Sequence, residues 1–382
     1  MHELGEILSE LKHAAGTSGG VLATVVHVKG SAYRRPGARM LLFHDGRRIG
    51  SISGGCLEGE ISRKAWWFTE SGRPVVRVYD TSSDDDAVWE FGLGCNGVVH
   101  VLLERVDALE SRALLEFLDV HRANGTPAVV ATVIRGGAAP AGARLFFDEA
   151  WVQGGSLAGT AVEAAILPHM CAALRESKSH FVHIADAEIF VEWVGPPLKL
   201  VIFGAGHDAI PLASLAKQFG WRVTVADGRP AYATRERFPQ ADRVAVMRGD
   251  NLLKGLEIGA ATAVVMMTHN YPLDERLLPG ILAARPWYLG MLGPKSRTEN
   301  LFGGRRIPPS VYGPVGIDLG GETPESIAVS IASEIQAALH QRGGGMLRYR
   351  EGPIHAPARE LGAPAATLEV ERERPQYCET HV

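Results

Sequence analysis

The sequence predicts an α/β protein with two parts, a duplicated α/β region followed by a doubly wound parallel sheet. Two observations lead to this prediction. In the first part, one pattern of short β-branched runs, glycine-rich turns and a helix occurs twice, with Gly37 and Gly142 at matching positions 105 residues apart. From Leu198 onward, strand-like and helix-like runs alternate, which is typical of a parallel sheet with helices on both faces.

The composition divides the chain into three segments. They are a duplicated region at 1–195 with repeats at about 20–105 and 126–195, an alternating domain at 198–345, and a tail at 346–382. Pro196 and Pro197 interrupt regular structure between the first two segments. The tail is rich in Gly, Pro, Ala and charge, so we expect it to be poorly ordered or loosely docked.

The two copies share residues that a common fold would need. "ATVV" at 23–26 matches "ATVI" at 131–134, Arg39 matches Arg144, and Glu58 matches Glu163. Each copy is interpreted as strand, turn, strand, glycine-rich turn and helix, closed by a further strand. We therefore expect a helix-capping or other structural role for Glu58, and a structural role for Arg39.

The cysteine turn of the first copy differs from its counterpart. "SISGGCLEGE" begins at Ser51 and "SLAGTAVEAA" at Ser156, so Thr160 and Ala161 replace Gly55 and Cys56. The fold therefore does not require the thiol, which makes Cys56 and its neighbours Gly54 and Gly55 candidate functional residues. Backbone amides in such turns can lower the pKa of a thiol. The alternative is a small residue that fills space.

Other residues of the first region have similar alternatives. Cys95 in "FGLGCNG" also lies on a glycine-rich turn, whereas Cys171 is expected in the core of an apolar helix. Arg34 and Arg35 in "SAYRRPGARM" have no counterpart in the second copy. Clustered guanidinium groups suit a phosphate or carboxylate ligand, and the alternative is a solvated basic turn.

The alternating domain opens with a dinucleotide-binding pattern. In "LKLVIFGAGHDA" a strand leads into Gly204-x-Gly206-x-x-Ala209, a helix follows, and a second strand ends at Asp227. This context is that of a Rossmann-like domain, in which the helix N-terminus approaches a phosphate. Asp227 would accept hydrogen bonds from a ribose or another diol.

Later strands are predicted at "DRVAVM", "ATAVVMMTH", "PWYLGML" and "GPVGIDL". Ligands of such sheets lie beyond the carboxyl ends of the strands. His269 is expected at that edge, near His207 and Asp208 of the glycine loop. The alternatives are a surface histidine without a functional role for His207 and a residue that only lines the turn for His269. The last helix should begin with Thr323 as its N-cap and Pro324 as its first residue.

The bulk composition excludes several classes of protein. Four cysteines without a C-x-x-C pair argue against a disulfide framework and a structural zinc site. A formal charge of −4 argues against a nucleic-acid partner bound through a basic surface. The first residues form an amphipathic acidic helix, and no apolar run approaches membrane-spanning length. We expect a cytoplasmic protein without a membrane partner.

Together these motifs resemble the XdhC/CoxI family, the accessory proteins of molybdenum hydroxylases such as xanthine dehydrogenase and carbon monoxide dehydrogenase. The resemblance rests on "GSAYRRPGARM", "GSISGGCLEGEI", "FGLGCNG", "GAGHDAIPLASLAKQFGWRVTVADGRP", "VVMMTHNYPLD", "LGPKSR" and "GIDLGGETPESIAVSIASEI". It covers most of residues 15–342 in the order of the family. Asn96 departs from the Gly-Cys-Gly-Gly that is typical of the family.

The resemblance implies a chaperone without turnover of its own. It would bind the molybdenum cofactor (molybdopterin), hold it during sulfuration and deliver it to an apo-hydroxylase, with a cysteine desulfurase as a second partner. A thiolate of Cys56 or Cys95 could contact molybdenum. The candidate cofactor-binding residues are Arg34, Arg35, Gly54, Gly55, Cys56, Cys95, Gly204, Gly206, His207, Asp208, Asp227 and His269.

Two other functions fit parts of the sequence. The Rossmann pattern and Asp227 would suit an NAD(P)-dependent oxidoreductase, or a nucleotide such as NAD(P) bound beside the pterin. Cys56 alone would suit a thiol-dependent protein that handles persulfides. We also expect a homodimer, although no sequence feature demonstrates one.

Overall fold

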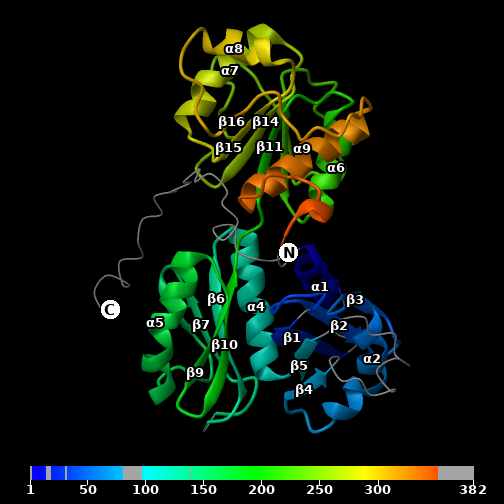
Figure 1. Cartoon of the computed structure of the whole chain (residues 1–382), viewed down its shortest axis with the longest axis vertical. Coiled ribbons are helices and arrows are strands. Elements are labelled where there is room, and N and C mark those ends of the chain that lie inside the picture. Colours follow the sequence, from blue (N-terminus) through cyan, green and yellow to red (C-terminus); the bar gives the residue numbers. More distant parts are fainter. Residues whose placement is uncertain (1, 14–18, 31, 81–96, 138, 352–382) are drawn as a thin grey trace. The chain divides into compact units, whose positions relative to one another are not determined.

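The computed structural model describes residues 2–13, 19–30, 32–80, 97–137 and 139–351, and of His2 and Cys56 the backbone alone. The chain divides between Pro196 and Pro197 into two compact units (Figure 1). Cys95 and residues 352–382 of the predicted tail lie outside the described residues. Within the described part, no helix is long and apolar enough to span a bilayer.

The first unit contains the same succession of elements twice. The first copy consists of α1 (His2–His13), β1 (Gly20–Gly30), β2 (Arg39–Phe43), β3 (Arg48–Gly50), α2 (Cys56–Phe68), β4 (Val75–Asp80) and β5 (Gly97–Arg105). The second consists of α4 (Leu109–Asn124), β6 (Ala128–Arg135), β7 (Arg144–Asp148), β8 (Trp151–Gly154), α5 (Ala161–Glu176), β9 (His180–Ile184) and β10 (Ala187–Val194). The antiparallel sheets have the orders β3-β2-β1-β5-β4 and β8-β7-β6-β10-β9, which are topologically identical.

The two sheets of this unit pack face to face. Figure 1 shows α2 and α5 on opposite outer sides of the unit. Val21 and Val25 of β1 share a core with Ile61 of α2, whereas Val26 packs with Phe190 from the second sheet. Because side chains alternate along a strand, β1 is buried on both faces, and this burial explains its continuous apolar run.

The second unit is a parallel sheet covered on both faces. Its elements are β11 (Lys199–Phe203), α6 (Ala209–Gln218), β12 (Arg222–Asp227), β13 (Arg243–Val246), β14 (Thr262–Met266), α7 (Tyr271–Ala283), β15 (Tyr288–Met291), α8 (Lys295–Phe302), β16 (Val311–Tyr312), α9 (Pro324–Leu339) and the 3₁₀ turn η1 (Leu347–Tyr349). The order β13-β12-β11-β14-β15-β16 is the Rossmann order, which reverses between β11 and β14. Helices α6 and α9 cover one face, and α7 and α8 the other (Figure 1). The predicted fold class is confirmed.

One predicted strand is wrong. The run "GPVGIDL" at 313–319 contains no strand, and the last strand of the described residues is β16, just before it. Pro314 has no N–H to donate to a sheet, so pairing ends at Tyr312. The start of the last helix is confirmed, because the Thr323 side chain accepts a hydrogen bond from Ser326 N and Pro324 is the first helical residue.

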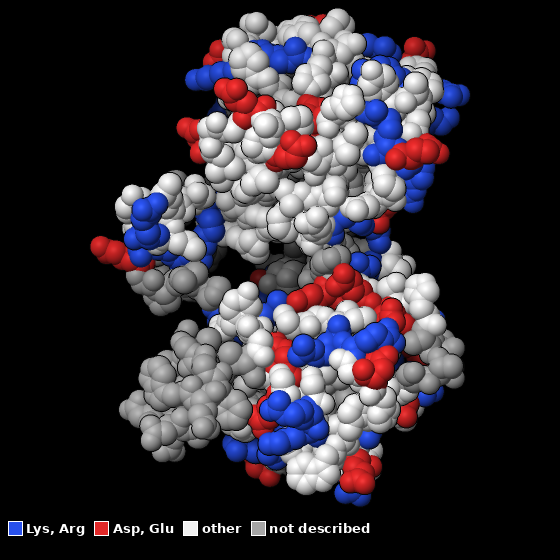
Figure 2. All heavy atoms as spheres, turned by 90° about the vertical axis from the view of Figure 1, so that its right-hand side faces the viewer, with Lys and Arg blue, Asp and Glu red and all other residues white. Residues whose placement is uncertain are grey.

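Figure 2 shows one face of the molecule with charged side chains coloured by sign. On that face, Lys and Arg side chains lie intermixed with Asp and Glu side chains in both units. The intermixing agrees with the small formal charge of the chain, −4.

Candidate functional site

The cysteine turn has a backbone that differs from its counterpart. Gly55 precedes the first residue of α2, Cys56, and has a φ of 118°, in the region that favours glycine. In the second copy, Thr160 precedes α5 with a φ of −93°, and Gly159 takes the positive φ instead. The backbone conformation before α2 therefore favours glycine at position 55. Comparing the two copies by sequence alone does not reveal this reason for the residue.

Glu58 holds this turn together. Its carboxylate accepts hydrogen bonds from the amides of Ile52 (3.1 Å), Ser53 (2.7 Å) and Gly55 (3.1 Å), and from the Ser53 hydroxyl. Burial acts to raise the pKa of Glu58, but the hydrogen bonds from Ser53 and from the backbone outweigh it and hold this pKa below its ordinary value. The expected capping role is confirmed, and Glu163 likewise accepts from Gly159 N.

The arginine turn lies beside the cysteine turn. A Cβ placed on Gly54 would be 3.8 Å from the ring of Tyr33, which is 68% exposed. Arg34 forms an ion pair with Glu3 of α1, and the other oxygen of Glu3 accepts from Ser51 Oγ at 3.2 Å. The structure thus brings Arg34 and the cysteine turn together.

A cavity of about 370 Å³ adjoins the arginine turn, and it is lined by Glu3, Leu4 and residues 33–39. Arg35, on its rim, is exposed. Arg39 is different, because its guanidinium is buried and paired with Glu192 of β10, as that of Arg144 is with Glu104 of β5. The expected structural role of Arg39 is confirmed.

In the second unit, the glycine loop after β11 meets the loop after β14. A Cβ on Gly204 would lie 2.3 Å from Met267 O, and one on Gly206 would lie 2.6 Å from Asp208 Oδ1. Close approach to the backbone therefore requires glycine at position 204, whereas the neighbour of Gly206 is the end of a side chain. Asp208 caps α6, and its Oδ2 lies 2.6 Å from Nε2 of His269.

His269 has a φ of 54° and a side chain that is 63% exposed. A left-handed histidine at the point where the strand order reverses is an uncommon backbone state. His207 of the glycine loop is exposed as well. The predicted pair of histidines thus lies on the ligand edge of the sheet, where Asp208 orients one of them.

Asp227 is engaged by the chain itself. It is buried, and its carboxylate accepts from Ala205 N (2.7 Å), Arg229 N (2.8 Å), Arg229 Nε (3.0 Å) and Arg229 Nη2 (2.8 Å). Burial acts to raise the pKa of Asp227, but the Arg229 side chain and the two amides outweigh it and lower this pKa. Four donors occupy the four acceptor positions of a carboxylate, so a diol would have to displace Arg229.

Sequence reasoning did not single out Glu3 or Tyr33. Tyr33 lies inside the quoted arginine motif, but Glu3 carries no signal beyond its place on the polar side of an amphipathic helix. Their partners, Arg34 and the turn at 51–54, come from other parts of the chain.

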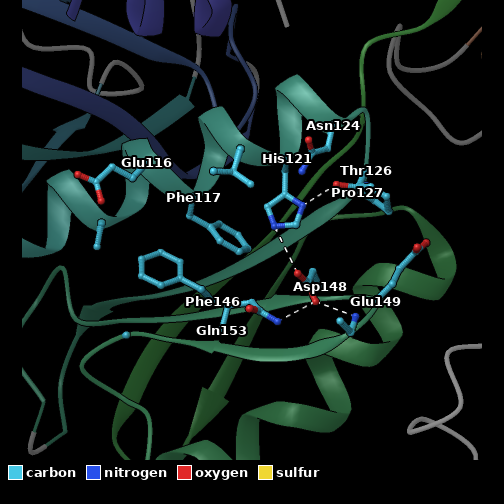
Figure 3. A pocket seen from close by; sticks show the side chains of 14 residues that line it. Glu116, Phe117, His121, Asn124, Thr126, Pro127, Phe146, Asp148, Glu149 and Gln153 are labelled. Carbon is cyan, nitrogen blue, oxygen red and sulfur yellow. Dashed lines mark hydrogen bonds and ion pairs between the residues drawn. The ribbon is translucent and has the colours of Figure 1, made fainter. Parts of the chain in front are cut away.

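A larger cavity, of about 600 Å³, lies in the second copy between α4 and the hairpin of β7 and β8 (Figure 3). His121 binds Thr126 Oγ1 through Nδ1 at 2.8 Å, and its Nε2 lies 3.4 Å from Asp148 Oδ2. Asp148 also accepts from the amides of Ala150 and Trp151. These polar groups close the end of α4 and the hairpin turn, which is a structural role.

Over the described ranges, no group of three or more His, Cys, Asp or Glu residues is arranged to hold a metal ion. Cys95 lies outside these ranges, and of Cys56 only the backbone is described. A role of either cysteine toward a metal therefore stays a prediction.

Comparisons with known families match both units. Residues 200–335 match the XdhC Rossmann domain model. Residues 14–80 and 121–185 match the model of the XdhC and CoxI family, with one segment in each copy of the repeat.

Individual relatives cover most of the chain. It is 34% identical over 317 residues to a probable xanthine dehydrogenase subunit of Bacillus subtilis, covering 82% of this chain and 92% of that protein. It is 25% identical over 332 residues to the molybdenum cofactor insertion chaperone PaoD of Escherichia coli, covering 85% of each. A crystal structure described as a xanthine dehydrogenase from Bacillus halodurans superposes with a TM-score of 0.76 at 32% identity, covering 90% of this chain and 97% of that one.

Proposed function

Because the chain belongs to the XdhC and CoxI family, we propose that it binds the molybdenum cofactor, protects it during sulfuration and delivers it to a xanthine dehydrogenase-type apo-enzyme. The relative named a molybdenum cofactor insertion chaperone supports this proposal. The chain acts as a cytoplasmic, homodimeric carrier without turnover of its own. Its partners are the apo-hydroxylase and a cysteine desulfurase.

The observation that best supports this function is the meeting of the arginine and cysteine turns in the first copy. Arg34 contacts the Glu3 carboxylate, which Ser51 of the cysteine turn also contacts. A pyranopterin cofactor carries a phosphate at one end and a soft metal–sulfur centre at the other. Guanidinium groups suit the phosphate, and a thiolate suits the metal.

The residues of the two turns fit such a cargo. Cys56 is the first residue of α2, and the positive end of a helix dipole favours a thiolate there. Among the described residues, a Cβ on Gly55 would meet nothing within 4 Å, which leaves space for a ligand beside this backbone. The exposed ring of Tyr33 offers a flat face to a planar heterocycle. Cys95 is proposed as a second thiolate.

We also propose that the glycine loop of the second unit contains cofactor-binding residues. Gly204, Gly206, His207, Asp208 and His269 lie along its ligand edge. The nicotinamide alternative needs a free acid for the ribose, whereas the Asp227 carboxylate already accepts four hydrogen bonds. The contacts of Asp227 therefore favour the carrier over an NAD(P)-dependent oxidoreductase.

The test is retention of the cofactor. The full chain is purified from cells that make the molybdenum cofactor, desalted gently, and assayed for molybdenum, pterin and nicotinamide. We expect pterin with the wild type and with Cys171→Ala, which removes a buried thiol of α5, and little pterin with Cys56→Ala. Retained nicotinamide and hydride transfer, without pterin under any condition, would contradict the proposal.

A further inference from the structure

A carboxylate of the chain itself contacts the guanidinium that the proposed function assigns to an anionic ligand. Glu3 lies in the first turn of α1. One of its oxygens pairs with Arg34 Nη2, and the other accepts from Ser51 Oγ at 3.2 Å. The side chains of Arg34 and Glu3 are 28% and 30% exposed, so water reaches the pair.

The two donors converge on this carboxylate as they would on a phosphate. Arg34 comes from the arginine turn and Ser51 from the cysteine turn. Glu3 and Arg34 also line the cavity of about 370 Å³, whose other lining residues are Leu4 and the rest of 33–39. That volume is within the range of small-molecule sites, about 300–1,000 Å³. The Glu3 carboxylate therefore contacts both turns and borders a cavity on the side of the arginine turn.

The second copy shows that folding does not require this use of the serine. Ser156, the counterpart of Ser51, accepts a hydrogen bond from Arg144 N at 3.1 Å. Ser51 instead donates its hydroxyl proton to Glu3. The serine therefore donates to an anion in the copy that carries the cysteine, and accepts from a backbone amide in the other copy.

Glu3 is also not needed to hold α1 in place. Ile7 and Leu8 of this helix are 0% and 5% exposed, and they belong to the core beneath it. Anchored in this way, the helix can stay where it is while the Glu3 side chain turns toward solvent. A flexible side chain whose carboxylate is in part reached by water can exchange with another anion.

Resting on the proposed function, we propose that Arg34 and Ser51 form the subsite for the terminal phosphate of the cofactor, and that Glu3 occupies it until the phosphate displaces it. A phosphate carries more charge and more acceptor oxygens than a carboxylate, so it competes well for the same donors. The returning Glu3 carboxylate competes with the bound phosphate, which favours release of the cargo during delivery.

The test compares cofactor binding by four full-length proteins: wild type, Glu3→Gln, Arg34→Gln and the double variant. Removing the competing charge should tighten binding by about two- to fivefold in Glu3→Gln. Removing the donor should weaken binding by about tenfold or more in Arg34→Gln. The double variant should bind as weakly as Arg34→Gln, because the gain from Glu3→Gln depends on Arg34.

Glu10→Gln is the matched control. It removes the same charge from α1 but breaks a pair with Arg47, whose Nη1 lies 2.9 Å from Glu10 Oε1. Its binding should equal that of the wild type. Circular dichroism checks that each variant is folded, and an unfolded Arg34→Gln is replaced by Arg34→Lys, which keeps the charge but loses the fork geometry and should bind more weakly.

The outcomes separate the two proposals. If the wild type binds cofactor but Glu3→Gln binds equally or more weakly, the displacement by phosphate is wrong while the carrier function stands. If Arg34→Gln binds as well as the wild type, the subsite lies elsewhere. If the wild type binds no cofactor, the proposed function is wrong, and the inference that rests on it is overturned too.

Discussion

Arg39 and Glu192 form a buried two-point ion pair that joins the two copies of the repeat. Nη1 and Nη2 of Arg39 lie 2.8 and 2.5 Å from the carboxylate oxygens of Glu192. The reciprocal pair joins Arg144 to Glu104, at 2.9 and 2.6 Å. Each arginine of one copy thus binds the glutamate of the other, so the two sheets are linked by the same contact twice.

Breaking the first pair should destabilise the first unit. Arg39→Met leaves Glu192 buried without its partner, and we expect a loss of about 3–5 kcal/mol in the free energy of unfolding. The double variant Arg39→Met/Glu192→Leu should recover most of this loss, because no uncompensated charge remains. Urea unfolding measures the stability of the single and the double variant, and hydrogen exchange in β2 and β10 locates the change. A single variant as stable as the wild type would show that the pair does not link the sheets.

Glu58 should contribute stability that depends on pH. Glu58→Gln removes a charged acceptor of several hydrogen bonds, and we expect a loss of about 1–2 kcal/mol at neutral pH. The pKa of Glu58 is lower in the folded chain than its ordinary value of about 4.3. Its contribution is therefore complete above that value, decreases as the pH falls through the lowered pKa, and is absent below it.

The measurement is the unfolding free energy of wild type and Glu58→Gln between neutral and acid pH. The difference between them should shrink as the pH falls through that range. Glu163→Gln is the control in the other copy, where one amide, Gly159 N, donates to the carboxylate. A difference that stays constant with pH would mean that the charge of Glu58 does not stabilise the turn.

A histidine pair should make the first unit sensitive to mild acid. His27 and His100 are paired across β1 and β5, with ring centroids 5.0 Å apart. Burial lowers the pKa of both histidines. The charge of His100 lowers the pKa of His27 further, and the charge of Lys29 lowers the pKa of both. Glu188 acts in the opposite direction on both values. The folded chain therefore favours the neutral form of both rings.

Because the folded pKa values lie below the ordinary value of about 6.5, stability is complete above that pH and decreases as the pH falls toward the folded values. His27→Gln/His100→Gln should lack this decrease. Thermal unfolding between about pH 7.5 and 5 tests it, with His44→Gln as a control on a ring that stacks on Trp66. An unchanged pH slope in the double variant would contradict the assignment.

The Cys56 thiol should react as a thiolate near neutral pH. As the first residue of α2, it should have a pKa below the ordinary value of about 8.5. Alkylation by iodoacetamide, followed for each cysteine peptide by mass spectrometry across pH, measures this pKa. Cys171, which is 4% exposed, should stay unmodified in the same samples. A midpoint for Cys56 at or above 8.5 would exclude an activated thiol.

The two-part fold could be predicted from the amino-acid sequence because its signals are local. Strand periodicity, the glycine pattern between strand and helix, and the repeat at a fixed offset all depend on neighbours along the chain. The same comparison of copies identified Glu58 and Arg39 as structural, since both recur in the second copy. The prediction of a strand at 313–319 was wrong. The β-branched residues of this run favoured a strand, and too little weight was given to its single proline, Pro314.

The contacts between side chains of the candidate sites became clear only from the tertiary structure. Asp227 looks like a free ribose acceptor in the sequence, but Arg229 occupies its carboxylate. Arg34 looks like an unpaired cation, but Glu3 lies against it from a different element. These contacts depend on side-chain positions that elements distant along the chain set together, and no periodicity or spacing of residues encodes them.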